Sequence, residues 1–147
     1  MKIDETSINI IKLLREGRKS FREIAQELGL AENTVRSRVT ALQEDGLLEI
    51  TGQVDPSALP GHRVGIVGVK LDTMALVQKG EEFSRLKGVV SVSVVTGRFD
   101  LILMVLLNND FDLLEFYTSE VSRVSEVQSV ETFVVYKGFN LRVPYIL

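Results

Sequence analysis

The chain has 147 residues, of which 45% are hydrophobic and 25% are charged, a balance typical of a folded globular protein. It has no cysteine and a single histidine, His62, which excludes a disulfide framework and a zinc site built from cysteine or histidine, and we expect neither a metal nor a cofactor. The formal net charge is −3, with 8 Lys/Arg against 9 Asp/Glu in residues 1–53 and 9 against 11 in residues 54–147, so neither part is a basic domain that binds DNA through charge alone.

Three short helices are predicted in the first third of the chain. The first follows the acidic and hydroxyl residues 4–7 and ends at Gly17. The second carries apolar residues at helical spacing and is stopped by Gly29, and the third begins near Glu32 and ends at Gly46. Connections this short predict a compact helical unit.

Beyond this unit the pattern changes to strands that alternate with helices. Residues 47–54 are predicted to form a short strand, and residues 55–65 concentrate proline and glycine as a linker. The elements predicted after the linker are, in chain order, a strand over 64–71, a helix over 75–86, strands over 89–96 and 101–107, a helix over 111–124 and a strand over 130–136. The order is β-α-β-β-α-β.

A short internal repeat supports this order. The stretch SRLKGVVSV, residues 84–92, matches SRVSEVQSV, residues 122–130, at five of nine positions. Both copies lie where a predicted helix passes into a predicted strand. Two βαβ halves built on one plan form a ferredoxin-like sheet.

The helical unit has the spacing of a DNA-binding helix-turn-helix. Such a motif needs a small residue where two helices nearly touch, a glycine at the turn and an apolar residue that locks the second helix, and Ala25, Gly29 and Val35 fill these roles. The third helix then lies in the major groove. An ordinary solvated helix face is the alternative, and the spacing of these three residues favours DNA.

The third helix and the cations before it supply the candidate DNA contacts. On the outer face of that helix, asparagine can read adenine, arginine can read guanine, and serine or threonine can reach bases or phosphates. The cations before the helix are candidate phosphate contacts, each alternatively a solvated charge, and Arg38 borders the apolar stripe, where it pairs with an acid or touches phosphate. The predicted DNA-binding residues are Arg18, Lys19, Arg22, Glu32, Asn33, Thr34, Arg36, Ser37, Arg38 and Thr40.

The start of the third helix is unusual. Ala31 occupies the N-cap, where serine, threonine, aspartate or asparagine is preferred, and Glu32 compensates in part by placing negative charge at the helix N-terminus. The same carboxylate would meet DNA, where it selects against particular bases and can accept a hydrogen bond from cytosine.

Four stretches of the chain resemble the Lrp/AsnC family, the feast/famine transcription regulators of bacteria and archaea: DETSINIIKLLREGRKSFREIAQELGL, TVRSRVTALQEDGLL, ITGQVDPSALPG and VVSVSVVTGRFDLILMV. The resemblance extends over essentially the whole chain, and the second and fourth stretches are the most specific. The resemblance implies an α+β fold with a winged helix-turn-helix over residues 1–52, a linker over 53–63 and a ferredoxin-like βαββαβ domain for effector binding and oligomerisation over 64–147.

The resemblance also implies that a small molecule, usually an amino acid, binds between dimers near the turn before the strand 101–107. The implied effector-binding residues are Thr96, Gly97, Arg98, Phe99, Asp100 and Thr132, the last approaching from a neighbouring chain. Asp100 is the candidate partner of the ammonium group, although plain hairpin chemistry also explains Gly97 and Asp100. Arg98 and Ala31 differ from the family pattern, and Arg98 either attracts a carboxylate or obstructs the pocket.

Two alternatives compete with a regulator. A sirohaem-decarboxylase-like enzyme shares this architecture, but such enzymes carry histidines around this hairpin, whereas His62 lies in the linker, so that acid–base chemistry has no agent and we expect no catalytic residue. A metabolite-binding oligomer of the same fold without DNA binding would explain the acidic charge and Ala31. The strand 101–107 is apolar on both faces, which favours dimerisation over cover within the monomer.

Location and partners follow from the same features. The N-terminus is acidic where a signal peptide is positive, and the longest apolar run, residues 101–107, is about a third of the length that spans a bilayer. We therefore predict a cytoplasmic homo-oligomer, a dimer or an assembly of dimers, that binds double-stranded DNA and a small amino-acid-like effector and no membrane. Several recognition helices in one assembly act together on repeated half-sites of the DNA. Weak electrostatic attraction between each single helical unit and DNA is then enough for binding.

Overall fold

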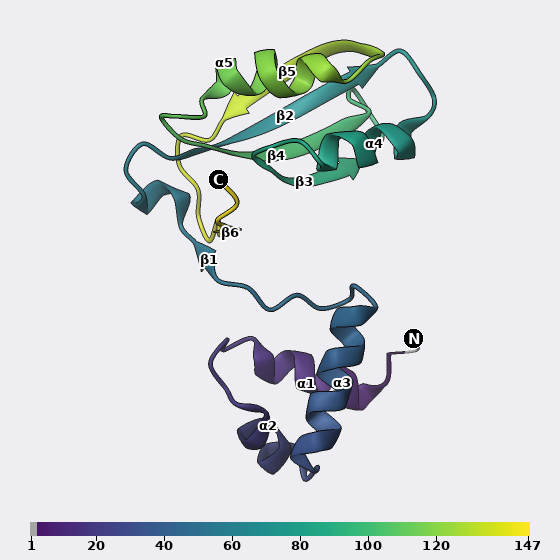
Figure 1. Ribbon diagram of the computed structural model, residues 1–147, viewed down its shortest axis with the longest axis vertical. Coiled ribbons are helices and arrows are strands. Elements are labelled where there is room, and N and C mark those ends of the chain that lie inside the picture. The colour runs from purple at the N-terminus through teal and green to yellow at the C-terminus, as the bar shows by residue number, and fades with distance from the viewer. Residues whose placement is uncertain (1–2) are drawn as a thin grey trace. The chain divides into compact units, whose positions relative to one another are not determined.

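The computed structural model describes residues 3–147 and divides into two compact units, Met1–Thr51 and Gly52–Leu147 (Figure 1). The predicted linker, residues 53–63, lies within the second unit. No helix in the described residues is long and apolar enough to cross a membrane. In the same part of the chain, no three His, Cys, Asp or Glu side chains gather where they could hold a metal ion.

Three helices form the first unit: α1 (Glu5–Leu14), α2 (Phe21–Leu28) and α3 (Glu32–Glu44). Asp4 caps α1 by accepting a hydrogen bond from the Ser7 N–H at 2.8 Å, and Ser20 and Glu23 form a capping box at the start of α2. α3 begins after Ala31 with no side-chain cap, as predicted. The three helices enclose one core of buried side chains: Ile10, Ile24, Ala25, Val35 and Val39.

The turn between α2 and α3 confirms the helix-turn-helix prediction. Gly29 ends α2 in the left-handed conformation, with φ of 66°, and its amide donates to the Ala25 carbonyl. Ala25 is 4% exposed and Val35 is fully buried, so the small residue and the apolar lock both lie where the helices meet.

A four-stranded antiparallel sheet forms the centre of the second unit, in the order β3-β4-β2-β5. Its strands are β2 (Arg63–Leu71), β3 (Val89–Val94), β4 (Leu101–Leu107) and β5 (Val127–Val134). α4 (Leu76–Ser84) joins β2 to β3. A second helical segment joins β4 to β5 and consists of α5 (Leu113–Glu115), a π-helix over Phe116–Glu120 and a 3-10 turn over Val121–Arg123. The predicted β-α-β-β-α-β order and ferredoxin-like topology are confirmed.

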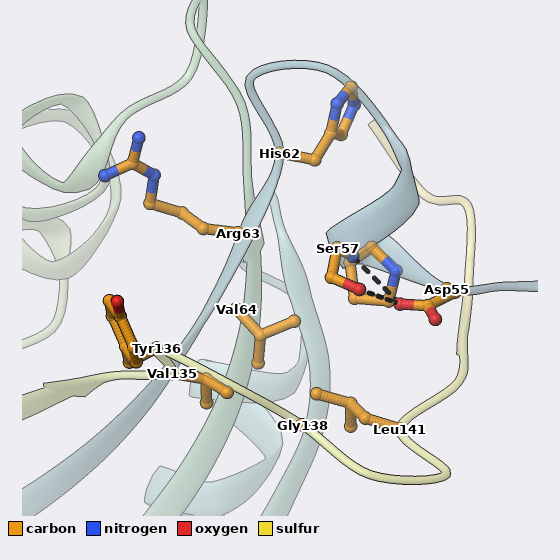
Figure 2. Close-up of a pocket in the computed structure, with 10 residues that line it drawn as sticks. Asp55, Ser57, His62, Arg63, Val64, Val135, Tyr136, Gly138 and Leu141 are labelled. Atoms are coloured by element: carbon orange, nitrogen blue, oxygen red, sulfur yellow. Dashed lines mark hydrogen bonds between the residues drawn. The ribbon is translucent and has the colours of Figure 1, made fainter.

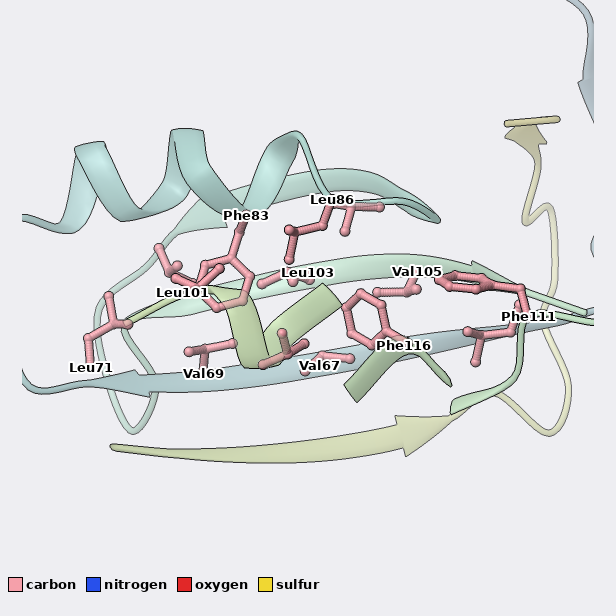
Figure 3. Close-up of a cluster of buried hydrophobic side chains, with 14 residues drawn as sticks. Val67, Val69, Leu71, Phe83, Leu86, Leu101, Leu103, Val105, Phe111 and Phe116 are labelled. Carbon is pink, nitrogen blue, oxygen red and sulfur yellow. The ribbon is translucent and has the colours of Figure 1, made fainter. Parts of the chain in front are cut away.

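Both helical segments pack on one face of this sheet (Figure 3). Phe83 of α4 and Phe116 of the π-helix are fully buried against Val67 of β2 and Leu103 of β4. Because alternate side chains of a strand point to opposite faces, the neighbouring residues of β2 and β4 lie on the other face, which we call the open face. Its central residues, among them Ile66 and Met104, are half-buried.

The end of the chain covers one end of the open face. β6 (Val143–Pro144) pairs with β1 (Gln53–Val54), and Val143 is buried together with Val64 and Leu106. The sequence does not predict β6, because two residues that include a proline have no periodicity. Of the strand predicted over 47–54, only the last two residues form a strand, and these are β1.

Several other predicted boundaries were wrong by one to three residues. The last strand runs over 127–134 instead of 130–136, because its pairing with β2 begins opposite Leu71. The helix predicted from 111 begins at Leu113, because the Asn108 side chain accepts from the N–H groups of Asp110 and Phe111 and holds a turn there. Local periodicity does not report such pairing limits.

The internal repeat has a counterpart in the backbone. Gly88 and Glu126 occupy the same place in the two copies, and both have a left-handed backbone, with φ of 82° and 63°. The Gly88 carbonyl accepts from the Leu106 N–H at 2.7 Å, and the Glu126 carbonyl accepts from the Asp72 N–H at 2.8 Å. Glu126 has a Cβ and so disfavours this conformation, and its carboxylate lies 3.3 Å from the Nζ of buried Lys79.

Gly88→Ala should destabilise the second unit. A Cβ there would lie 2.5 Å from the Phe111 ring and 2.9 Å from the Leu106 carbonyl oxygen, in a conformation that alanine disfavours. We expect the free energy of unfolding to fall by about 2–4 kcal/mol. Urea denaturation followed by tyrosine fluorescence measures it, because every tyrosine lies in this unit. Gly52→Ala is the matched control, since a Cβ there meets nothing within 4 Å, and equal losses would contradict the argument.

Candidate DNA-binding and effector sites

The outer face of α3 is a polar surface on a rigid support. Val35, Val39 and Leu42 are at most 1% exposed and fix the inner face of the helix. A shallow hollow runs along the outer face beside Ala41. The predicted DNA-binding residues that are exposed on this helix are Glu32, Asn33, Thr34, Arg36, Ser37 and Thr40.

Arg36 is held at two points. Its Nη2 donates to Glu32 Oε1 at 2.8 Å, one helical turn earlier, and its guanidinium carbon lies 5.2 Å from the ring centre of Phe21 on α2. The side chains of Arg36 and Glu32 are 56% and 46% exposed. Arg36 therefore has a defined position while its guanidinium stays accessible.

Arg38 is directed toward α1. Its Nη1 donates to both carboxylate oxygens of Asp4, each at 2.8 Å, and to Ser7 Oγ at 3.0 Å. The pKa of Asp4 falls from 3.8 to about 2, first because the Ser7 amide donates to it and then because Arg38 does. Of the two roles predicted for Arg38, pairing with an acid is the one that the fold supplies.

The three cations before α3 differ in their partners. Lys19 Nζ lies 2.6 Å from Glu27 Oε2, and this hydrogen bond raises the pKa of Lys19. Arg18 and Arg22 are exposed, and neither forms an ion pair within residues 3–147. An acid of the same unit therefore competes for Lys19, and the phosphate contacts of all three cations stay predictions.

Asp100 holds the turn between β3 and β4 on the sheet. Its carboxylate accepts from the Leu71 N–H at 2.8 Å and from Lys70 Nζ at 3.2 Å. These donors, the Leu71 amide above all, lower the pKa of Asp100. The predicted partner of an ammonium group is thus already engaged, and an effector would have to share it with Lys70 or replace Lys70.

Phe99 and Arg98 lie over the open face. Gly68 of β2 makes room for Phe99, since a Cβ there would lie 2.7 Å from the ring carbons. Arg98 reaches β5, where its Nη2 lies 3.3 Å from Glu131 Oε2, and its guanidinium carbon lies 5.6 Å from the Phe99 ring centre. The Arg98 side chain is 79% exposed and so remains accessible to a carboxylate.

Thr132 lies on the opposite face of the sheet. It pairs with Val67 of β2, and its hydroxyl contacts the hydroxyl of Tyr117 in the π-helix. The sheet of one chain therefore separates Thr132 from Phe99 and Arg98. Thr132 therefore does not meet the turn of its own chain, and its approach from a neighbouring chain stays a prediction.

A cavity of about 210 Å³ lies at the other end of β2 (Figure 2). It is lined by apolar and polar residues: Asp55, Pro56, Ser57, His62, Arg63, Val64, Val135, Tyr136, Gly138 and Leu141. His62 Nδ1 donates to the Pro60 carbonyl at 2.9 Å, which leaves Nε2 to accept from the Tyr145 hydroxyl at 3.1 Å. The single histidine is thus a structural link, about 20 Å along the strand from the predicted effector turn.

Sequence reasoning missed the residues that support both sites. The predicted effector turn contacts three residues of the sheet, namely Gly68, Lys70 and Glu131. In the helical unit, Arg36 packs on Phe21, and Lys19 pairs with Glu27. A glycine inside a strand marks a close approach, so Gly68 had a usable signal. The other four resemble ordinary core or surface residues until their neighbours are known.

These features define a class of protein: a DNA-binding helix-turn-helix followed along the chain by a ferredoxin-like ligand-binding unit. A family model of winged helix-turn-helix DNA-binding domains matches residues 3–49. The family model of the Lrp/AsnC ligand binding domain matches residues 64–143, more than half of the chain. The chain belongs to the Lrp/AsnC family and is a DNA-binding transcription regulator with a ligand-binding domain.

Named regulators are similar to this chain over nearly its whole length. The HTH-type transcriptional regulator Ptr1 of Methanocaldococcus jannaschii is 29% identical over 142 residues, which cover 94% of this chain and 95% of that protein. The structure of AsnC from E. coli has a TM-score of 0.70 at 20% identity, and the match covers 94% of this chain and 95% of the AsnC chain. A transcriptional regulator of Neisseria meningitidis, solved as an L-Met complex, has a TM-score of 0.72 at 18% identity, covering 99% and 96%.

The Asp4–Arg38 pair makes the first unit sensitive to acid. Because the pKa of Asp4 is about 2 in the folded unit and 3.8 when unperturbed, its carboxylate stabilises the unit above about pH 4, and this stabilisation is lost as the pH falls through about 2. We expect Asp4→Asn to lower the amide-exchange protection of Ile10 and Ile24 and to flatten its acid dependence. Glu5→Gln should keep the acid response of the wild type, and flattening in both variants would contradict this assignment.

Gly68→Ala should displace Phe99, whereas Gly65→Ala on the same strand should be tolerated. A Cβ at Gly65 would lie 3.6 Å from the Thr132 methyl group, an ordinary contact. We expect Gly68→Ala to lower the free energy of unfolding by about 1–3 kcal/mol, and Gly65→Ala by less than about 1 kcal/mol, in urea denaturation followed by tyrosine fluorescence. Comparable losses would show that Gly68 does not seat the Phe99 ring.

Proposed function

We propose that α3 reads duplex DNA in the major groove through its exposed polar face, with Arg36 as the residue that reads guanine. The observation that carries the proposal is the position of Arg36, which Glu32 and Phe21 hold on the outer side of a helix whose inner side is buried. Arginine is the side chain that most often reads guanine, through O6 and N7. Arg18 and Arg22 supply phosphate contacts.

The effector in this proposal is a small amino acid bound at the β3–β4 turn. An α-amino acid carries an ammonium group and a carboxylate, and the turn offers Asp100 to the first and accessible Arg98 to the second. The exposed backbone of Thr96 and Gly97 provides further hydrogen-bonding groups. The L-Met complex of the Neisseria meningitidis regulator, a protein of the same fold, supports this class of ligand.

Two copies join through the open face in this proposal. Ile66 and Met104 are half-buried there, and Phe133, which pairs with Ile66, is 50% exposed. A partner sheet is a natural cover for apolar residues that no helix of the unit covers. A dimer brings two recognition helices to one DNA, which explains specific binding by a chain of net charge −3.

DNA binding is tested on duplexes that the purified protein selects from a random-sequence library. We expect submicromolar, salt-sensitive binding of the selected duplex by fluorescence anisotropy, and a loss of about 10- to 100-fold in Arg36→Ala, because a guanine contact contributes about 1–3 kcal/mol. Gln43→Ala, an exposed change on the same helix, is the matched control and should bind like the wild type. A wild-type protein that binds no duplex at low salt would contradict the proposal.

A further inference from the structure

Both arginines of α3 are paired with acids of their own unit, but the two pairs serve different purposes. Asp4 belongs to the start of α1 and caps it, so the Arg38–Asp4 pair ties two helices together. Glu32 lies on α3 itself, and within the described residues its side chain bonds only to Arg36. The Arg36–Glu32 pair therefore does not connect two elements of the fold. We look for its role in what the exposed face of α3 binds.

The Glu32 carboxylate is directed toward Arg36 and not toward the backbone. Glu32 is the acid in the first turn of a helix that has no side-chain cap, where a carboxylate is well placed to accept from free backbone amides. Its Oε1 instead accepts from Arg36 at 2.8 Å. Both side chains are about half exposed, 46% and 56%, so Arg36 can leave Glu32 for a partner that offers more acceptors.

We propose that Glu32 determines specificity by competing with DNA for Arg36, an inference that rests on the proposed function of α3. Where a guanine faces the helix, Arg36 exchanges one carboxylate oxygen for two acceptors of the base. Where no guanine is present, Arg36 stays with Glu32 and is withheld from the phosphates. Without Glu32, Arg36 is a free cation that any duplex attracts. Glu32 thus lowers the affinity for non-matching DNA more than the affinity for the operator.

The test compares Glu32→Gln with Glu49→Gln on the selected duplex and on a scrambled one. Glu49 is exposed in the same unit, and its replacement changes the net charge by the same amount. We expect Glu32→Gln to raise the affinity for scrambled DNA about tenfold and the affinity for the selected duplex by less than about threefold. Glu49→Gln should raise both affinities by the same small factor.

A double mutant separates competition from simple charge. In an Arg36→Ala background there is no arginine for Glu32 to withhold, so Glu32→Gln should leave the ratio of the two affinities unchanged. Circular dichroism at each step checks that the helices are intact.

The outcomes distinguish the inference from the function on which it rests. If the wild type binds no duplex at low salt, the proposed function itself is wrong. If the wild type binds specifically but Glu32→Gln and Glu49→Gln raise both affinities equally, Glu32 is only a negative charge and the inference alone is overturned. A loss of operator affinity in Glu32→Gln overturns it as well, because Glu32 would then support the operator complex instead of competing with it.

Discussion

The second unit depends on one strand that has no polar side. β4 consists of seven consecutive apolar residues, Leu101–Leu107, and since alternate side chains point to opposite faces, both faces of the sheet must be shielded from water. The two helical segments bury one face, with Phe83 and Phe116 fully buried against it. On the open face, Val143 buries Leu106 and leaves the middle of the strand half-buried. The surface proposed for a partner copy is a consequence of this incomplete cover.

Residues from outside the four strands also cover the two ends of the open face. Phe99 lies on Gly68, and Asp100 fastens the turn to the Leu71 amide, so the predicted effector turn is held at one end of the sheet. At the other end, the last residues of the chain pair with the first residues of the unit. β6 pairs with β1, and Arg142 lies 3.3 Å from Asp55. The segment that follows the helical unit is therefore held by the C-terminus.

The first unit has no excess of positive charge, so its DNA binding depends on how its cations are placed. Arg38 is tied to Asp4 of α1, and Arg36 lies against Glu32 and Phe21, so each arginine of α3 has an acid partner within its own unit. A cation that already has an acid partner is attracted less strongly to phosphate in general, which favours contacts to particular bases. A family of regulators that must find few sites among many benefits from this balance.

The sequence by itself determined the three helices, the order of the elements, the helix-turn-helix spacing and the polar residues on the outer face of α3. These features depend on periodicity, helix stops and short-range spacing, which a window of the chain contains. Only the tertiary structure decided which groups meet: Arg38 with Asp4, 34 residues away, Asp100 with the Leu71 amide, and β6 with β1. Such pairs follow from strand register and helix packing, and these are set by burial of the whole chain, which no local pattern records.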